Sequence, residues 1–154
     1  MSAQENGRGP RIVAGVDGSA SSITAMRWAV RQAELTGAAV DAVIAWHYPV
    51  AAAGYGWAPT GMDQTYDFKE IAEKLLADAL SNAVDPASDV SVRSFVVEGV
   101  PAQVLVDAAA GADLLVVGSR GHGGLAEALL GSVSQHCVQH AKCPVVVIRN
   151  QASG

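Results

Sequence analysis

The sequence is poor in aromatic and charged residues, which make up 5% and 16% of its 154 residues. Its 10 basic residues form no run, and its 15 acidic residues give a formal net charge of −5. Such a chain repels the phosphates of nucleic acid and offers no basic patch to an anionic membrane surface. We therefore expect neither a nucleic-acid-binding nor a membrane-binding protein.

Long apolar runs and a cysteine framework are also missing. No stretch reaches the roughly 18 consecutive apolar residues that a membrane-spanning helix needs. The first ten residues are polar and glycine-rich, unlike a secretory signal. Without such a signal the two cysteines, Cys137 and Cys143, are expected to be reduced thiols, and the protein is expected in the cytoplasm.

What the chain does contain is apolar sequence of small residues, mainly Ala and Val, within a hydrophobic total of 50%. This is enough apolar surface for a packed core, which a disordered chain lacks. The expected organisation is a flexible tail over residues 1–10, one α/β domain over residues 11–149, and a short tail over residues 150–154.

Apolar runs of strand length alternate with stretches of helical periodicity. The predicted strands are 11–16, 40–46, 90–97, 113–117 and 144–148. Helices are predicted from Ser19 or Ser21 to Gly37, over 63–83, from Pro101 and over 132–140. In the second helix the residues expected to face inward are Ile71, Leu75, Ala79, Leu80 and Ala83. This alternation predicts a doubly wound, parallel five-stranded sheet with helices on both faces.

In such a sheet, ligands bind beyond the carboxyl ends of the strands, where the winding reverses. Two segments follow strands in this way. Gly15-Val16-Asp17-Gly18-Ser19 ends the first strand, and the glycine-rich stretch from Val117 to Gly124 ends the fourth. The second stretch continues to Gly131-Ser132-Val133-Ser134, where a helix is predicted to begin.

The glycine-rich stretch has the properties of an anion site. Glycines let main-chain N–H groups approach an anion closely, and a helix N-terminus adds unpaired N–H donors. The hydroxyl groups of Ser132 and Ser134 could bind phosphate oxygens, and Arg120 could screen their charge. The alternative is a glycine-rich connector in which Ser132 only caps a helix.

Three further residues have two interpretations each. Asp17 could bind a ribose hydroxyl or a Mg²⁺ ion held by phosphates, or it could form an Asx turn that caps the next helix. Val43, with its neighbour Ile44, could contact adenine or belong to the strand core. His122 could contact phosphate or be exposed.

These segments together resemble the universal stress protein family. The resemblance rests on Val16-Asp17-Gly18-Ser19, on the spacing Gly118-x-x-Gly121 followed after nine residues by Gly131-Ser132, and on Cys143-Pro144-Val145-Val146-Val147-Ile148. The glycine spacing is similar to that of the family's ATP-binding branch, and Glu98-Gly99-x-Pro101-Ala102 is similar to its entry into the third helix.

The resemblance implies the strand order 3-2-1-4-5 and ATP bound between the ends of the first and fourth strands. It implies a homodimer paired through residues 144–148, whose apolar edge would otherwise be exposed. The nucleotide-binding residues that we expect are Gly15, Asp17, Val43, Gly118, Ser119, Arg120, Gly121, His122, Gly123, Gly124, Gly131, Ser132, Val133 and Ser134.

The pattern favours binding over turnover, because a Walker A loop needs a Lys beside its Ser and none stands beside Ser132. We expect a nucleotide-responsive regulator of the stress response. The alternatives are a slow ATPase or adenine-nucleotide-using enzyme, and a nucleotide-free dimeric interaction module.

Two other features have open roles. The loop over residues 49–61 could cover a ligand, contact a partner, or be a surface insertion. His136 and His140 with the nearby cysteines resemble part of a Zn²⁺ site, but a second ligand pair is missing from the sequence, which favours a buried Cys and two surface His.

Overall fold

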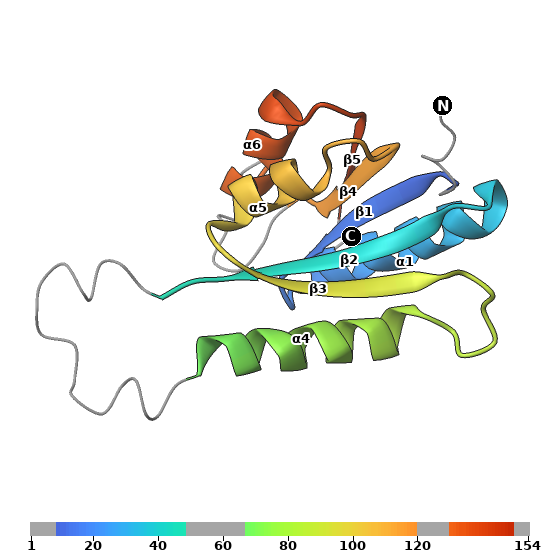
Figure 1. Ribbon diagram of the computed structural model, residues 1–154, viewed down its shortest axis with the longest axis horizontal. Helices are drawn as coiled ribbons and strands as arrows, with labels where there is room; N and C mark the ends of the chain where they lie inside the picture. Colours follow the sequence, from blue (N-terminus) through green and yellow to red (C-terminus); the bar gives the residue numbers. More distant parts are fainter. Residues whose placement is uncertain (1–8, 49–66, 120–129, 150–154) are drawn as a thin grey trace, which may run out of the picture.

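The computed structural model of the protein describes residues 9–48, 67–119 and 130–149. Strands and helices alternate along the chain (Figure 1). In chain order they are β1 (Arg11–Val16), α1 (Ala20–Thr36), β2 (Ala39–Trp46), α4 (Phe68–Ala83), β3 (Val92–Glu98), α5 (Pro101–Ala108), β4 (Leu114–Gly118), α6 (Ser132–His140) and β5 (Val145–Ile148).

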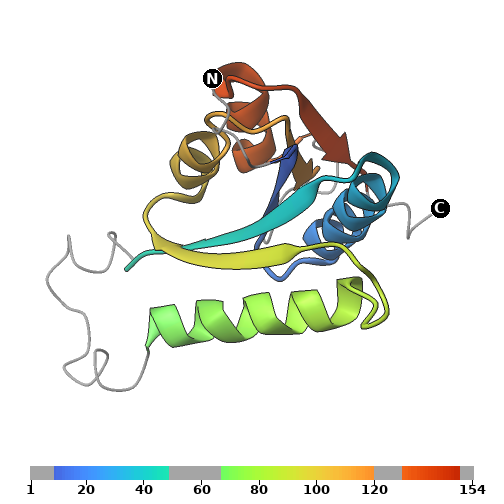
Figure 2. The same cartoon turned by 45° about the vertical axis from the view of Figure 1, so that its right-hand side comes forward.

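The five strands form one parallel sheet in the order β3-β2-β1-β4-β5. Helices α1 and α4 cover one face, and the shorter helices α5 and α6 cover the other (Figures 1 and 2). The predicted doubly wound fold and its strand order are therefore confirmed. The winding reverses between β1 and β4, which are neighbours in the sheet although two other strands separate them in the chain.

Helix α1 begins and ends where its sequence indicates. The side chain of Ser19 accepts a hydrogen bond from the Ser22 N–H at 3.2 Å, so Ser19 is the N-cap. Gly37 ends the helix with φ of 79°, a left-handed conformation that favours glycine. The helix is thereby held with its N-terminus just beyond the carboxyl end of β1.

The inward face of α4 agrees with the prediction at four of five positions. Ala79 is buried, and Leu75, Leu80 and Ala83 are partly buried against the core, whereas Ile71 is 45% exposed and not inward as expected. Its neighbour Ala72 lies inside instead, together with Leu76. Within the described part of the chain the helix starts at Phe68, after the N-cap Asp67; residues 63–66 lie outside it.

β2 starts one residue earlier and β5 one residue later than predicted, and β3 and β4 are shifted at both ends. β3 starts at Val92, because a turn precedes it in which the N–H of Ser88 donates to the Asp85 carbonyl and the N–H of Val90 donates to the Ser88 hydroxyl. β4 runs from Leu114 to Gly118, one residue later than predicted, and so ends at the glycine itself.

A buried carboxylate links three neighbouring strands near their amino ends. Asp41 on β2 is 3% exposed and lies within an otherwise apolar run. It accepts hydrogen bonds from Arg11 Nη1 at 3.2 Å and from Arg93 Nε and Nη2 at 3.0 and 3.1 Å. Hydrogen bonding to Asp41 raises the pKa of Arg93 above its ordinary value. This network joins β1, β2 and β3 at the edge opposite the expected ligand site.

Candidate functional site

The carboxyl ends of β1 and β4 lie next to each other. Ala14 is the register partner of Val116, so the two strands run side by side to the same edge of the sheet. Asp17 directly follows β1 and Ser119 directly follows β4. The structure thus brings together the two segments that were singled out in the sequence, at the place where a doubly wound sheet binds ligands.

Asp17 is held in a turn by its own main-chain neighbours. Its Oδ1 accepts a hydrogen bond from the Ser19 N–H at 2.8 Å, and its N–H donates to the Ser22 hydroxyl at 3.2 Å. The Asx-turn interpretation therefore describes part of its role. Oδ2 accepts no hydrogen bond from the described residues, and the residue is half-buried. One carboxylate oxygen is thus available to a ribose hydroxyl or a cation.

Hydrogen bonds connect the residues on the two sides of the glycine-rich segment. The carbonyl oxygen of Ser119 accepts hydrogen bonds from the Gly131 N–H at 2.6 Å and from the Ser134 hydroxyl at 2.9 Å. The Ser119 N–H donates in turn to the Ile148 carbonyl of β5 at 2.8 Å. Both Ser119 and Ser134 are buried. The end of β4 and the start of α6 are therefore fixed relative to each other and to the sheet.

The N-terminus of α6 keeps unpaired main-chain donors. The first helical hydrogen bond runs from the Gln135 N–H to the Gly131 carbonyl, at 2.9 Å, so the N–H groups of Ser132, Val133 and Ser134 have no acceptor within the helix. Gly131 is the N-cap and makes no side-chain cap. Ser19 and Asp67 cap α1 and α4, whereas α5, like α6, begins without a side-chain cap. Such an uncapped end attracts an anion.

Two expected glycines are also packing positions. A Cβ at Gly118 would lie 2.8 Å from the Ser21 carbonyl carbon of α1 and would also overlap the Ser21 hydroxyl. A Cβ at Gly15 would lie 2.7 Å from Leu105 Cδ1 of α5. These glycines allow α1 and α5 to approach the ends of β4 and β1, and the approach itself helps to shape the edge of the sheet.

Val43 lies in the middle of β2 and is 2% exposed, packed in the core beneath α5. Its expected contact with adenine stays a prediction. Arg120, Gly121, His122, Gly123 and Gly124 lie outside the described residues, as does the loop over residues 49–61, so the roles expected for them stay predictions.

Sequence reasoning missed Ser21 and Ser22. The Ser22 hydroxyl accepts a hydrogen bond from the Asp17 N–H, and the Ser21 hydroxyl lies 3.5 Å from the Ile148 carbonyl. Both side chains are buried in the first turn of α1. The signal available was a pair of serines at positions where a helix entering the core normally has apolar residues.

Near the end of α6, Cys137 is buried, His136 is half-buried and His140 is exposed. Cys137 is fully buried and free, and burial together with the neighbouring Cys143 raises the pKa of its thiol to about 11. Burial also raises the pKa of Cys143. In the part of the chain that the structure describes, no three His, Cys, Asp or Glu side chains are grouped so as to hold a metal ion.

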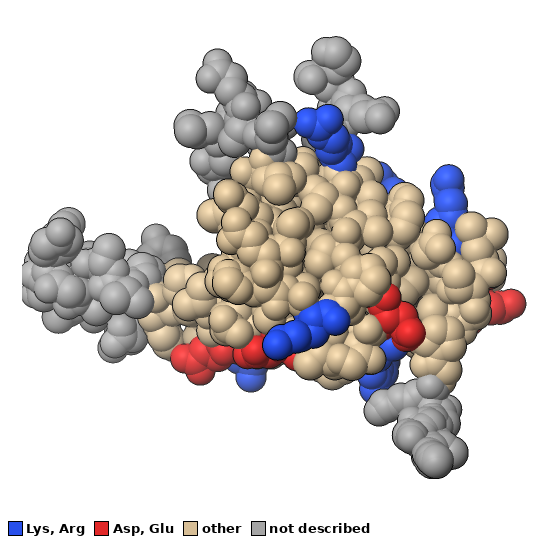
Figure 3. Space-filling model, turned by 90° about the horizontal axis from the view of Figure 1, so that it is seen from above, with Lys and Arg blue, Asp and Glu red and all other residues tan. Residues whose placement is uncertain are grey.

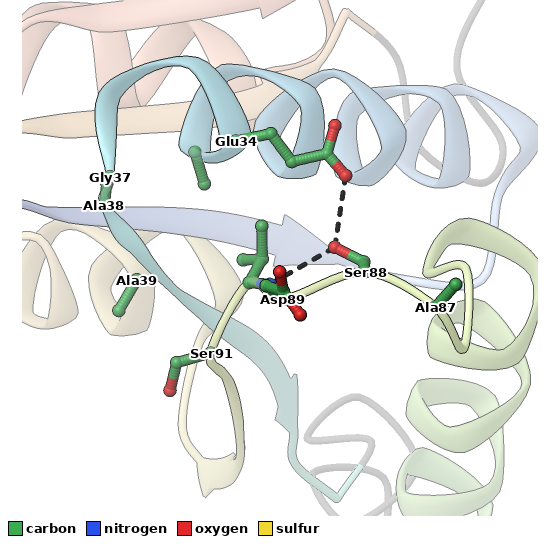
Figure 4. A pocket seen from close by; sticks show the side chains of 10 residues that line it. Glu34, Gly37, Ala38, Ala39, Ala87, Ser88, Asp89 and Ser91 are labelled. Atoms are coloured by element: carbon green, nitrogen blue, oxygen red, sulfur yellow. Dashed lines mark hydrogen bonds between the residues drawn. The ribbon is translucent and has the colours of Figure 1, made fainter.

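A hollow of about 520 Å³ lies at the amino edge of the sheet, between the end of α1 and the turn before β3. Figure 4 shows Glu34 and Ser88 facing each other across it, joined by a hydrogen bond of 3.1 Å from the Ser88 hydroxyl to Glu34 Oε2. It lies at the opposite edge from Asp17 and Ser119 and is separate from the candidate site.

The surface agrees with the charge composition. On the face shown in Figure 3, charged side chains are scattered, and the drawn Lys and Arg residues form no continuous patch. Of the helices in residues 9–48, 67–119 and 130–149, none combines the length and the apolar character needed to span a bilayer.

The chain is similar to known proteins over most of its length. The model of the universal stress protein family matches residues 10–149. A curated universal stress protein of Mycobacterium tuberculosis is 37% identical over 140 residues, which cover 90% of this chain and 43% of that one. The chain thus spans about half the length of the curated relatives it matches.

Solved structures share the fold. A universal stress protein in complex with cAMP is 27% identical, with a TM-score of 0.62, and the match covers 90% of this chain and 95% of that one. A universal stress protein of Archaeoglobus fulgidus in complex with dAMP is 23% identical, also with a TM-score of 0.62, and the match covers 90% and 96% of the two chains.

Proposed function

The chain belongs to the universal stress protein family, and from this premise we propose that it binds ATP at the carboxyl ends of β1 and β4 and acts as a nucleotide-responsive regulator in the cytoplasm. The observation that carries the proposal is the uncapped N-terminus of α6, whose free N–H groups lie at the edge of the sheet where Asp17 also lies. The free N–H groups suit the phosphates of a nucleotide, and the Asp17 carboxylate suits its ribose hydroxyls.

The phosphates belong at the α6 end of the site. Ser132, Val133 and Ser134 supply main-chain N–H groups, and Ser132 adds its exposed hydroxyl, whereas the Gly131 N–H is already donated to the Ser119 carbonyl. Gly118 and Ser119 lead into the segment that contains the remaining expected phosphate ligands, namely Arg120, Gly121, His122, Gly123 and Gly124. Because the hydrogen bonds to the Ser119 carbonyl fix the base of this segment, little ordering of that base is needed on binding.

Asp17 belongs at the sugar end. Its free Oδ2 suits a ribose hydroxyl, and it equally suits a Mg²⁺ ion that is also bound to phosphate oxygens. The cAMP and dAMP complexes of related proteins support adenine as the base. The choice of the triphosphate rests on the spaced glycines, which extend the anion site beyond a single phosphate.

Regulation is favoured over turnover because no Lys stands beside Ser132, as a Walker A loop requires. Asp17, the one carboxylate placed at the site among the described residues, is assigned to the sugar or to Mg²⁺ in this proposal. A slow ATPase would release ADP steadily, and a nucleotide-free interaction module would not bind ATP.

The test is to purify the chain, denature it and identify the released nucleotides, then titrate the emptied protein with ATP, ADP, AMP and cAMP by calorimetry. We expect close to one adenine nucleotide per chain and the tightest binding for ATP. Gly121→Val should abolish binding, whereas Gly9→Val, at an exposed position where an added Cβ meets nothing within 4 Å, should retain it. A wild-type protein that ignores all four nucleotides would refute the proposal.

We also propose that two copies pair through β5, within the stretch 144–148. This strand is at the edge of the sheet, and its four residues, all Val or Ile, are only partly buried. Val146→Glu should shift the protein to monomers in sedimentation velocity, whereas Leu35→Glu, on the 76% exposed position of α1, should leave dimers intact. A folded, dimeric Val146→Glu protein would contradict this interface.

A further inference from the structure

Two histidines face each other on the last turns of α6. His136 and His140 are four residues apart, and their ring centroids are separated by 4.3 Å with the ring planes inclined at 36°. His136 is half-buried and His140 is exposed. Neither imidazole forms a hydrogen bond or an ion pair with the described residues, so their nitrogen lone pairs have no protein partner there.

The separation of the ring centroids is close to that of two imidazoles bound to one metal ion. With metal–nitrogen bonds of about 2.0–2.1 Å, two imidazoles at an angle of about 90° around the metal have centroids roughly 4.5 Å apart, and at a tetrahedral angle roughly 5.2 Å apart. The observed 4.3 Å is nearer the first value. Right-angled coordination is typical of tetragonal Cu²⁺ and Ni²⁺, and less so of Zn²⁺.

The remaining ligands would be water. No third His, Cys, Asp or Glu of the described residues joins the pair. Cys137 follows His136 in sequence, but its side chain is fully buried in the core beneath α6 and not on the outer surface with the histidines. A site of two imidazoles and water favours the metal at the top of the divalent affinity series, which is Cu²⁺.

We propose that His136 and His140 form a two-histidine Cu²⁺ site on the outer surface of α6. Binding would bridge the last two turns of the helix and stabilise the folded chain in proportion to the metal concentration. The proposal is independent of nucleotide binding, because the pair is at the carboxyl end of α6 and the candidate nucleotide site is at its amino end.

The experiment compares the untagged protein with a variant of identical composition. In the double variant Val138→His/His140→Val the same residues occupy α6, but positions 136 and 138 project from different sides of the helix and cannot share a metal. Val138 is 49% exposed and His140 is exposed, so the exchange should not disturb the core. Both proteins are titrated with CuCl₂ and with ZnCl₂ against a competing chelator.

We expect one Cu²⁺ per chain in the wild type, weaker Zn²⁺ binding, and at least about a tenfold loss of Cu²⁺ affinity in the exchanged variant and in His136→Ala. Cu²⁺ should raise the melting temperature of the wild type but not of the exchanged variant. His47→Ala should bind as the wild type does. Equal Cu²⁺ affinity in the wild type and the exchanged variant, or loss of binding in His47→Ala, would overturn the proposal.

Discussion

The Gly131 N–H donates to the Ser119 carbonyl oxygen across a distance of 2.6 Å, so the strand that leads into the glycine-rich segment is tied directly to the helix that follows it. The same oxygen accepts a second hydrogen bond, from Ser134. Because both serines are buried, this arrangement is part of the protein core as well as the support of the candidate phosphate site.

Ser134→Ala tests this support. It removes one hydrogen bond to a buried carbonyl that keeps its other donor, so we expect a loss of about 1 kcal/mol in the free energy of unfolding. Nucleotide affinity should fall as well, because the start of α6 is less firmly held. Urea denaturation and ATP titration measure the two effects.

Ser132→Ala is the matched control for Ser134→Ala. Ser132 is exposed and makes no side-chain hydrogen bond to the described residues, so its loss should weaken ATP binding and leave stability within about 0.5 kcal/mol of the wild type. If the two variants have equal stability, the Ser134 hydroxyl does not support the site.

Gly118→Ala should destabilise the protein more than Gly15→Ala does. The new methyl group at 118 would meet the main chain of Ser21, which cannot move without displacing α1, whereas at 15 it would meet the terminal methyl groups of the Leu105 side chain, which can shift without moving the main chain. We expect losses of about 3 and about 1 kcal/mol, respectively, in chemical denaturation. The reverse order would mean that α1 is less tightly packed on β4 than the distances indicate.

Most of the fold could be predicted from the sequence because the hydrophobic periodicity agrees with the residues that begin and end helices. Ser19 and Gly37 mark the two ends of α1, and Pro101 marks the start of α5. The inward face of α4 was less certain because Ile71 and Ala72 are neighbours and periodicity alone does not choose between the faces they belong to. Only packing against the sheet decides, and it placed Ala72 inside.

The location of the candidate site could be predicted from the sequence, but the packing contacts that hold its residues in position could not. Asp17 and Ser119 follow two strands whose neighbouring positions in the sheet the family resemblance already implied. The double role of Gly118, by contrast, depends on how closely Ser21 approaches it, a distance between segments far apart in the chain. Asp41 was missed for a similar reason, since its two arginines come from β1 and β3 and only the assembled sheet brings them together.

Asp41→Asn should be among the most destabilising conservative substitutions in the chain. It removes the charge that pairs with Arg11 and Arg93 and leaves the partly buried Arg11 without a counter-ion, so we expect a loss of about 3 kcal/mol by urea denaturation. Asp113→Asn is the control, because Asp113 is exposed and its amide form still accepts from the Arg11 N–H. Equal losses would show that the buried network contributes little.

Cys137 should make stability depend on pH above the neutral range. The thiol has an ordinary pKa of 9.0, and burial raises this pKa to about 11 in the folded chain. Between these values the folded protein holds a proton that the unfolded chain has lost, so the stabilisation is complete below about pH 9 and is lost as the pH rises towards 11.

A shift of this size corresponds to about 2 to 3 kcal/mol. Unfolding in urea at pH 8 and pH 10.5 should show a smaller loss on raising the pH for Cys137→Ala than for the wild type, although the variant is less stable at pH 8 because it leaves a cavity. The comparison isolates the thiol, because the Lys and Tyr residues titrate in both proteins. Parallel pH profiles would mean that the buried thiol ionises as readily in the folded chain as in the unfolded one.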